Sequence, residues 1–572
     1  MSESLIKSPR FLPLLVTFSI RPARLGRRGP SRNGHPQDLC SNTAGRRRAA
    51  GRRLPRQRPA TGLRGGHPCA HACRQRVATP QPAAWRRLLP PLCPVRSAPR
   101  LVTALGSFAA RCAEQPDRAA LIEADGHVLS YAALDGWAAA LALRYERAGI
   151  GPGTRVLVAL GMSAELYAVL IALWRLGAVA VFPEPAAGLA GLRHALMTTQ
   201  PAFFVGPRWL GALAACLAGR PALAFPLTIE RVRETGRPPP AWSDDQPALI
   251  SFTSGSTGQP KGILRSHGFL LRQQEALTPL LRPDAPARDL VCLPLFVLAG
   301  LGFGTTSILP AVSLRRPASI DAVTLAAQIE RSGATRLLAP PSIAGALATE
   351  PAFGRLKEVF TGGGPVWPDL MRRLLQAAPG ARIFAVYGST EAEPVAHQAL
   401  HDLTTGDWTE MEAGGGLLTG PPIAGIAVRI VEDEIQVSGA HVNRGYLDPS
   451  QDAANKVQDG TAIWHRTGDA GRLGSDGRLW LLGRLDGRAG SWFPFAVEVA
   501  ARSWPGVTQA ALIGDSGATT LVLAGDRDFE PIWRERIKTF PGLGLRILAR
   551  IPLDRRHQAK VDYAELKRAF HK

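Results

Sequence analysis

The chain has 572 residues and a formal net charge of +22; 45% of its residues are hydrophobic and 20% are charged. At about 150 residues per domain it can bury more than one core, which excludes a collagen-like chain, a coiled coil and disorder throughout. Its longest apolar run, residues 166–174, is much shorter than the ~20 residues that span a bilayer, which argues against a transmembrane protein.

The positive charge is concentrated at the start of the chain. Residues 1–100 hold 20 arginines and one lysine against two acids, a net charge of +19, whereas the rest carries only +3. Residues 1–98 are rich in Arg, Pro and Gly without an apolar period, so we predict a disordered extension. A secretory signal, a transit peptide and a nucleic-acid-binding tail each explain part of this composition. We favour a mis-set translation start, because the composition changes abruptly near Leu101.

Cysteine is sparse in the rest of the chain. Of seven cysteines, four lie in the first hundred residues, and Cys112, Cys216 and Cys292 are scattered through the remainder. Three scattered cysteines do not form a disulfide framework, so a reducing compartment and a cytoplasmic location are predicted. The nearly neutral composition after the tail confines any nucleic-acid partner to the tail itself.

From Leu101 onward, short apolar runs alternate with amphipathic stretches. The runs predicted as strands cover residues 155–160, 178–182, 202–205, 249–253, 291–296, 336–339 and 382–387. Residues 164–177 and 322–332 have the i, i+3, i+4 spacing of helices. This alternation indicates a largely parallel sheet with helices on both faces. Later, strands are predicted at 426–431, 434–438 and 478–483, and a small α+β module follows Asp486.

The most specific segment is SFTSGSTGQPKGI, residues 251–263, directly after a predicted strand. Its glycines allow the backbone to turn its N–H groups inward, and its hydroxyls and Lys261 add further donors. Such a loop suits a polyphosphate, whose oxygens need many donors at short range. Its spacing is not that of a Walker A loop. The alternative is a Ser/Gly linker, which would not normally adjoin a buried strand.

A second polar segment, AVYGSTEAE at residues 385–393, also follows a predicted strand. Ligands of open α/β sheets gather at the carboxyl ends of strands. Tyr387 offers a flat face to a base, Thr390 a hydroxyl, and Glu391 a hard oxygen ligand for Mg²⁺. Upstream, FTGGGP at residues 360–365 ends another strand with three glycines, where a planar ring can lie against bare backbone.

Three later segments are less specific. WHRTGD, residues 464–469, predicts a tight Thr-Gly turn that presents Asp469 to the hydroxyls of a ribose. GRLD, residues 483–486, offers Arg484 to a phosphate or ribose, and a short polar loop near the end of the chain carries Lys560. Each alone is equally explained as a turn Asp, a surface Arg and a solvated Lys.

In this order, the segments resemble the acyl-adenylate-forming superfamily, which includes acyl-CoA synthetases, luciferases and peptide-synthetase adenylation domains. The resemblance covers about residues 103–570. It implies an α/β fold with a large N-terminal AMP-binding domain, residues 99–484, made of stacked doubly wound sheets with a β-rich subdomain. A small mobile α+β lid domain, residues 485–572, would follow, with Asp486 as the hinge.

The resemblance also implies ATP and Mg²⁺ as cofactors and assigns roles to individual residues. Lys560, Thr390 and Glu391 would be catalytic; Lys560 would bridge the carboxylate and the α-phosphate, and Glu391 would bind Mg²⁺. The residues implied in nucleotide binding are Thr253, Ser254, Gly255, Ser256, Thr257, Gly258, Lys261, Gly362, Gly363, Gly364, Tyr387, Gly388, Ser389, Asp469 and Arg484.

The implied reaction is attack of a carboxylate on the α-phosphorus of ATP with release of pyrophosphate, followed by acyl transfer to an acceptor such as CoA. An apolar stretch at residues 293–304 favours a fatty acid as substrate. Val297 stands where many CoA ligases have His. The WHR and DRRHQAK segments resemble the β-lactone synthetases of olefin biosynthesis, in which the substrate's own β-hydroxyl attacks the adenylate. A third interpretation is a non-catalytic adenylate-binding scaffold with a basic nucleic-acid-binding tail.

Overall fold

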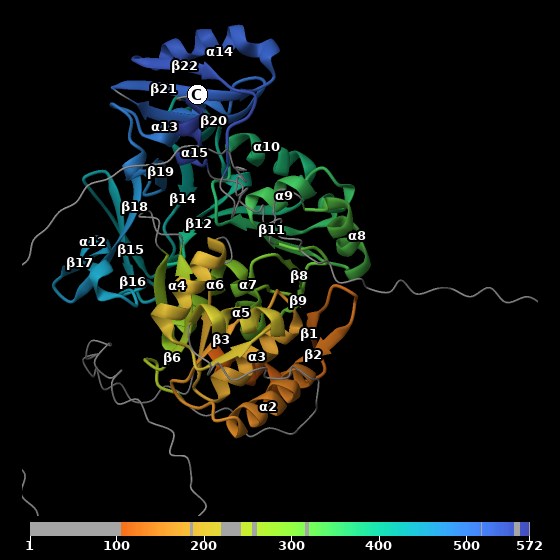
Figure 1. The fold of residues 1–572 in the computed structure, drawn as a ribbon. Coiled ribbons are helices and arrows are strands. Elements are labelled where there is room, and N and C mark those ends of the chain that lie inside the picture. The colour runs from red at the N-terminus through yellow and green to blue at the C-terminus, as the bar shows by residue number, and fades with distance from the viewer. Residues whose placement is uncertain are drawn as a thin grey trace, which may run out of the picture. The chain divides into compact units, whose positions relative to one another are not determined.

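Strands and helices alternate along the chain from Ala104 onward, as the sequence predicts, and the strands form four sheets in the part that the structure describes. The structure is a computed structural model that describes residues 104–183, 187–218, 242–253, 260–314, 320–515, 517–553 and 561–570. All of these lie within one compact unit, Pro94–Lys572 (Figure 1). The predicted extension, residues 1–98, lies outside the described residues.

The first sheet has five strands. In spatial order they are β5 (Phe203–Val205), β3 (Arg155–Val158), β4 (Val179–Phe182), β6 (Pro247–Thr253) and β7 (Lys261–Ser266). The first four are parallel, and β7 returns antiparallel to β6. The segment predicted to bind a polyphosphate therefore connects the last two strands at one edge of this sheet.

The second sheet has eight strands. In spatial order they are β13 (Ala392–Ala399), β12 (Arg382–Ser389), β11 (Glu358–Gly362), β10 (Arg336–Ala339), β8 (Arg288–Val291), β9 (Thr306–Ile308), β1 (Ala119–Ile122) and β2 (Val128–Ser130). The six central strands are parallel, and an antiparallel strand closes each edge. The FTGGGP and AVYGSTEAE segments thus end neighbouring parallel strands, β11 and β12.

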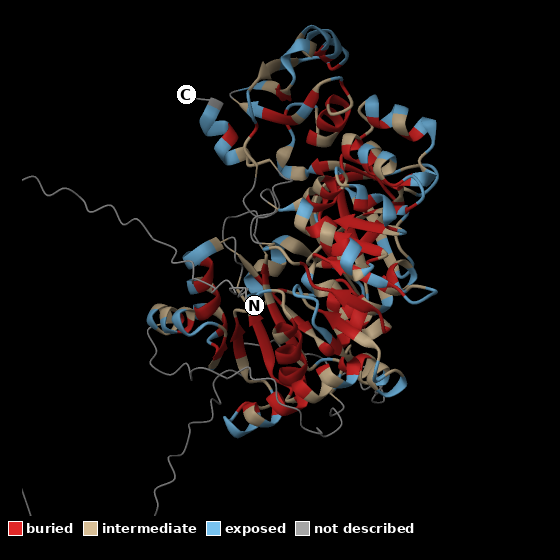
Figure 2. Cartoon of the chain, turned by 90° about the vertical axis from the view of Figure 1, so that its right-hand side faces the viewer, coloured by how far each residue is buried: buried red, intermediate tan, exposed pale blue. Residues whose placement is uncertain are grey.

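Helices cover these two sheets and join their cores. They are α1 (Ala104–Glu114), α2 (Tyr131–Arg147), α3 (Ala164–Arg175), α4 (Gly188–Thr199), α5 (Arg208–Ala218), α6 (His267–Leu281), α7 (Pro294–Phe303), α8 (Ala322–Ser332), α9 (Pro341–Leu347), α10 (Pro368–Ala377) and α11 (Thr405–Glu412). Helix α3 carries the longest apolar run and is buried on nearly every side, which explains why it is not amphipathic. One cluster of buried side chains includes residues of both sheets and α3 (Figure 2). The predicted architecture of stacked, doubly wound sheets is confirmed.

The β-rich subdomain is an antiparallel sheet. Its strands are β14 (Leu417–Gly420), β19 (Leu479–Arg484), β18 (Ala462–Leu473), β16 (Glu434–Gly439), β15 (Ile426–Val431) and β17 (Lys456–Asp459), which pairs with β18 beside the short helix α12 (Asp452–Asn455). The C-terminal part contains β20 (Val507–Asp515), β21 (Ala518–Gly525), β22 (Leu543–Ile547), α13 (Pro494–Ala501), α14 (Glu530–Arg536) and α15 (Tyr563–Phe570). This confirms the small α+β module predicted after Asp486.

One predicted strand is wrong. Residues 291–296 do not continue as a strand, because β8 ends at Val291 and helix α7 begins at Pro294. Proline lacks the N–H that a central strand needs, and its fixed φ suits the first position of a helix. Among the described residues, no helix combines the length and apolar character needed to cross a bilayer.

Candidate functional site

The phosphate-loop segment forms the connection of the β6–β7 hairpin. Thr253 and Lys261 face each other across this hairpin, so its two ends are fixed by strand pairing. The five loop residues predicted to bind phosphate between them lie outside the described residues; they are Ser254, Gly255, Ser256, Thr257 and Gly258. The structure therefore places Lys261 and Thr253 at the base of the loop.

Two lysines meet at the aromatic ring of Tyr446 near this loop. The Nζ atoms of Lys261 and Lys456 each lie 5.3 Å from the ring centroid, within the range of a cation–π contact. Lys261 also donates a hydrogen bond to Asn455 Oδ1 at 2.8 Å, and Lys456 donates to the carbonyl of Asn443. Burial lowers the pKa of Lys261 and lowers that of Lys456 to about 8. Two ammonium groups held this close form a site suited to an anion.

Glu391 lies beside these lysines. Its Oε1 accepts a hydrogen bond from the Tyr446 hydroxyl at 3.1 Å, and its carbonyl accepts from the Asn443 N–H at 2.7 Å. Its own N–H donates to Ser389 Oγ at 3.3 Å. Mg²⁺ takes hard oxygen ligands and is commonly held by one or two carboxylates with substrate phosphates. An oriented carboxylate next to two phosphate-compatible cations fits that pattern.

Tyr387, Asp469 and Arg484 form a second polar group. The Tyr387 hydroxyl donates to Asp469 Oδ2 at 2.8 Å, and Arg484 Nη1 donates to Asp469 Oδ1 at 3.0 Å. Burial and the Asp469 charge hold the pKa of Tyr387 well above its usual range, so it stays a donor. The structure thus brings together residues that the sequence places 82 positions apart. It leaves an aromatic ring and a fixed carboxylate side by side.

The sequence predicts that Asp469 follows a tight turn, and this prediction is wrong. Residues 464–469 lie inside the long strand β18. The pairing of β18 with β16 shifts register here, and Gly468 has a φ of +68°. A Cβ on Gly468 would lie 2.6 Å from Arg484 Nη2. The buried carboxylate of Glu434 accepts from the Gly468 N–H at 3.1 Å. A β-bulge, not a turn, therefore presents Asp469.

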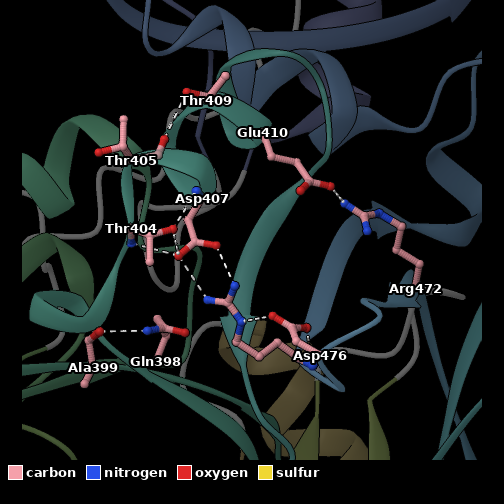
Figure 3. A network of polar contacts seen from close by, with 10 residues as sticks. Gln398, Ala399, Thr404, Thr405, Asp407, Thr409, Glu410, Arg472 and Asp476 are labelled. Carbon is pink, nitrogen blue, oxygen red and sulfur yellow. Dashed lines mark hydrogen bonds and ion pairs between the residues drawn. The ribbon is translucent and has the colours of Figure 1, made fainter.

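The strand carrying Asp469 is also anchored at its far end. Arg478, beside the β18–β19 turn, donates two hydrogen bonds of 2.6 and 3.0 Å to the carboxylate of Asp407 (Figure 3). Asp407 in turn completes a capping box with Thr404 at the start of α11. Glu410, one turn further along α11, pairs with Arg472 of β18. These contacts fix the hairpin that carries Asp469 and Arg484 against a helix.

The predicted glycines leave little room for side chains around Tyr387. A Cβ on Gly362 would lie 2.6 Å from the carbonyl oxygen of Val386, and one on Gly388 would lie 2.9 Å from that of Ala392. Gly363 has a φ of +81° and open space in front of its Cα. Gly364 follows it at the end of β11. Bare backbone next to an aromatic ring suits a flat heterocycle.

An apolar pocket lies next to the polar residues. It is a partly open cleft with a cavity volume of about 30 Å³, and it is lined by Ala104, Trp174, Leu270, Gln273, Gln274, Leu277, Leu295, Phe296, Leu298, Ala299 and Glu393. Two of its walls are α6 and α7, so part of the apolar stretch at residues 293–304 lines this pocket.

Arg265 and Glu393 join the pocket to the polar site. Arg265, fully buried in β7, donates to Ser251 Oγ at 2.8 Å and to the carbonyl of Thr390 at 2.9 Å. Glu393 lines the pocket and accepts a hydrogen bond from Gln273 Nε2 at 3.4 Å. Burial raises the pKa of the Glu393 carboxyl to about 7, although the charge of Arg265 opposes this.

The remaining predicted residues lie in or next to the C-terminal part. Asp486 is exposed in the short turn Leu485–Gly487, where its Oδ1 lies 3.9 Å from Arg484 Nε. Lys560 lies outside the described residues. The ends of its loop are described: Leu553 pairs with Val561, and the Tyr563 hydroxyl donates to the buried carboxylate of Glu498 at 2.6 Å.

Sequence reasoning did not select Lys456, Arg265 or Glu393. Arg265 alone had a usable signal, a charged residue in the alternating pattern of a strand. Lys456 stands in no motif. Glu393 is the last residue of the AVYGSTEAE segment, but no local pattern indicates that it lines a pocket.

Comparison with known proteins agrees with this geometry. Residues 108–447 match the family described as AMP-binding enzyme. The olefin beta-lactone synthetase of Stenotrophomonas maltophilia is 30% identical over a 503-position alignment that covers 77% of this chain and 90% of that protein. The feruloyl-CoA synthase of an Amycolatopsis species is 30% identical over 431 residues, 72% of this chain and 85% of that protein.

A solved structure has the same fold. It is the amide bond synthetase McbA of Marinactinospora thermotolerans, which superposes with a TM-score of 0.69 at 23% identity over 82% of this chain and 99% of that chain. The family match covers more than half of the sequence and includes Lys261, Tyr387 and Glu391, whereas Lys456, Asp469 and Arg484 follow its last residue. The chain therefore belongs to the AMP-binding enzyme family and is an acyl-adenylate-forming ligase.

Proposed function

We propose that this enzyme activates a lipophilic hydroxy acid with ATP and then closes the acyl-adenylate onto the acid's own hydroxyl. In the first step a carboxylate oxygen forms a bond to the α-phosphorus while the bond from that phosphorus to the bridging oxygen breaks, so pyrophosphate leaves. In the second step the hydroxyl oxygen attacks the acyl carbon, AMP leaves, and the hydroxyl proton is released. The product is a β-lactone when the hydroxyl is on the β-carbon.

The geometry supports several of the roles proposed for the first step, and the roles of Thr390 and Lys560 come from the family resemblance. Lys261, at the base of the phosphate loop, would hold the β- and γ-phosphates, and Asp469 would accept hydrogen bonds from the ribose. The adenine would lie between Tyr387 and the backbone of Gly363. Mg²⁺ bound at Glu391 would neutralise charge on the phosphate oxygens. Thr390 and Lys560 would hold the α-phosphate and the attacking carboxylate, where negative charge concentrates.

One observation carries the choice of a lipophilic acid: a pocket with a mostly apolar lining includes Glu393, which stands two residues beyond Glu391. The internal hydroxyl is favoured by the two olefin beta-lactone synthetases, from different organisms, among the relatives at 30% identity. Val297 also stands where many CoA ligases of the resembling family have His, so a thiol acceptor has less sequence support.

A thiol acceptor is the second candidate, supported by the similarity to a feruloyl-CoA synthase. CoA or a carrier thiol would then displace AMP in place of the internal hydroxyl. The two candidates share the adenylation step and differ only in acceptor.

Pyrophosphate exchange into ATP with a panel of fatty and 3-hydroxy fatty acids tests the first step. Mass spectrometry of the products, with and without CoA, tests the second: a dehydrated acid mass without CoA supports the lactone, and a thioester only with CoA supports the thiol. Lys560→Ala is expected to lower the exchange rate by about 10²–10³-fold, as removal of a preorganised donor does. An unchanged rate would remove Lys560 from the mechanism, and absence of exchange with every acid would contradict the adenylation step.

A further inference from the structure

The wall of the apolar pocket contains one carboxylate, that of Glu393. Eight of the eleven lining residues are apolar, and Gln273 and Gln274 are the other polar ones. A charged or polar group in such a wall is costly unless it is hydrogen-bonded. An alkyl chain alone would offer this carboxylate no hydrogen-bond donor.

The protein satisfies this carboxylate only in part. Within the described residues its one hydrogen bond comes from Gln273 Nε2 and is long, at 3.4 Å. The nearby Arg265 directs its own donors to Ser251 and to the carbonyl of Thr390. A carboxylate has about four lone-pair sites, so Glu393 can accept further hydrogen bonds from the pocket side.

The position of Glu393 restricts what can donate to it. It follows Glu391 by two residues on β13, and Arg265, which holds the Thr390 carbonyl, exerts its charge on both glutamates. Of the residues that line the pocket, Glu393 is therefore the one linked, through Arg265 and its closeness in sequence to Thr390 and Glu391, to the residues proposed to hold the reacting carboxyl and phosphate. A donor on a bound acid would reach it from a carbon close to the carboxyl group.

The charge of Arg265 also decides between two kinds of donor. A substrate ammonium would be attracted by Glu393 but repelled by the fully buried guanidinium beside it. A neutral hydroxyl gains the hydrogen bond to the carboxylate without that repulsion. The surroundings therefore favour an alcohol over an amine.

We propose that Glu393 accepts a hydrogen bond from a hydroxyl that the substrate carries near its carboxyl group, and that it thereby selects hydroxy acids over plain fatty acids. This inference rests on the proposed adenylation of a lipophilic acid and names the residue that determines the substrate class. It makes Glu393 a specificity residue of the pocket.

The test compares a 3-hydroxy fatty acid with the plain fatty acid of equal chain length, using full-length protein and pyrophosphate exchange. The wild type is expected to prefer the hydroxy acid in kcat/KM. Glu393→Leu, which keeps the approximate size and removes the acceptor, is expected to lower this preference by about 10- to 100-fold, the range of a hydrogen bond to a charged group. Glu393→Gln keeps a neutral acceptor and is expected to lower it by a smaller factor, about 3- to 10-fold.

Leu298→Ala is the matched control, since it enlarges the same pocket and removes no polar atom. It is expected to change kcat/KM for the two acids by the same factor. An unchanged preference in Glu393→Leu, or in Glu393→Gln should the leucine variant not fold, would overturn the inference and leave the proposed function standing. Stronger exchange with the matching 3-amino acid would also overturn it. Absence of exchange with any acid in the wild type would instead overturn the proposed function.

Discussion

Asp469 shows how a single carboxylate is prepared for a ligand. The Tyr387 hydroxyl and Arg484 each donate to a different oxygen of Asp469, and both donors come from strand ends that the fold fixes. Such paired hydrogen bonds to a charged group orient it more firmly than neutral ones do. The carboxylate therefore keeps its direction before any nucleotide binds.

Asp469→Asn is expected to raise the KM for ATP by about 10- to 100-fold, because the amide loses the charge that strengthens hydrogen bonds from ribose hydroxyls. Pyrophosphate exchange at varied ATP measures this. Asp476→Asn is the control, since this exposed acid lies in the turn of the same hairpin, away from Tyr387, and should leave the KM unchanged. A KM for ATP that Asp469→Asn leaves at the wild-type value would contradict the assigned role.

Glu498 is a buried acid whose protonation affects the stability of the fold. It is 1% exposed, accepts from the Leu512 N–H at 2.8 Å and from the Tyr563 hydroxyl, and burial raises its pKa to about 7. A carboxyl whose pKa is higher in the folded state than in the unfolded state stabilises the fold fully below pH ~4.5, and this contribution is lost as the pH rises through about 7.

Glu498→Gln is therefore expected to flatten the pH dependence of the free energy of unfolding between pH 5 and 8, by about 2–4 kcal/mol for a shift of this size. Urea unfolding followed by the fluorescence of the buried Trp533 in the same C-terminal part reports it. A variant whose stability falls with pH as steeply as the wild type would show that Glu498 is not the group that titrates.

At the scale of elements, helix α11 fixes the hairpin that carries Asp469 and Arg484. The Arg478 side chain donates two hydrogen bonds to Asp407, which also caps the helix, and this interaction lowers the pKa of the Asp407 carboxyl (Figure 3). A depressed pKa means that the contribution of Asp407 to stability is present above its ordinary pKa and is lost as the pH falls through the depressed one.

Asp407→Asn is expected to lower the free energy of unfolding at pH 7 by about 2–3 kcal/mol, through a weakened cap and a lost charge on a nearly buried pair. The variant should also lose part of the destabilisation that the wild type shows in acid. Glu410→Gln removes the more exposed neighbouring ion pair with Arg472 and should cost at most about 0.5 kcal/mol. Equal losses in the two variants, measured by chemical denaturation, would contradict the importance of the Asp407 contact.

The sequence predicts the bounds of a helix or strand well when the segment ends at a clear boundary, and poorly when only its apolar character is visible. Strand β10, helix α8 and strand β15 have the predicted bounds, because each ends at a clear boundary: Pro340 follows β10, Gly333 follows α8 and Glu432 follows β15. The run at residues 291–296 is wrong because apolar character alone does not distinguish a strand from a buried helix such as α7. The turn before Asp469 is wrong because a glycine at positive φ also occurs in a bulge.

Only part of the candidate site could be predicted from the sequence. The segments around Tyr387 and Glu391 were found because residues with distinctive chemistry stand at the end of a strand, and the segment around Asp469 was found although it lies inside one. Lys456 and Glu393 were not, because their position depends on long-range contacts such as the hydrogen bond between the Asn443 N–H and the Glu391 carbonyl. No local pattern records such a contact.

At the scale of the molecule, helix α13 of the C-terminal part contacts helix α10. Arg502 donates to both oxygens of Asp369, at 2.8 and 2.9 Å, and its guanidinium lies 5.1 Å from the centroid of the Trp367 ring. Phe495 of α13 packs against the same ring at 5.0 Å. A bidentate ion pair on an aromatic ring is a stronger contact than an isolated surface pair.

Arg502→Met is expected to loosen this contact and to speed trypsin cleavage at the exposed Arg488 about tenfold, because cleavage follows the population of the open form. Limited proteolysis with mass spectrometry of the fragments measures the rate. Arg534→Met, which removes an exposed pair within α14, serves as the control and should cleave at the wild-type rate. Equal rates in Arg502→Met and in the wild type would show that the contact does not hold the two parts together.

The β19 strand ends at Arg484, which bonds to Asp469 and stands directly before the turn Leu485–Gly487 that leads into the C-terminal part. A nucleotide bound at Asp469 and a rearrangement of that turn would therefore both affect the guanidinium of Arg484. By thermodynamic reciprocity, any factor by which nucleotide occupancy shifts the pose of the C-terminal part is the factor by which that pose alters affinity for the nucleotide. If the nucleotide binds at Asp469 as proposed and the C-terminal part moves about this turn, the release of AMP and that movement are energetically linked.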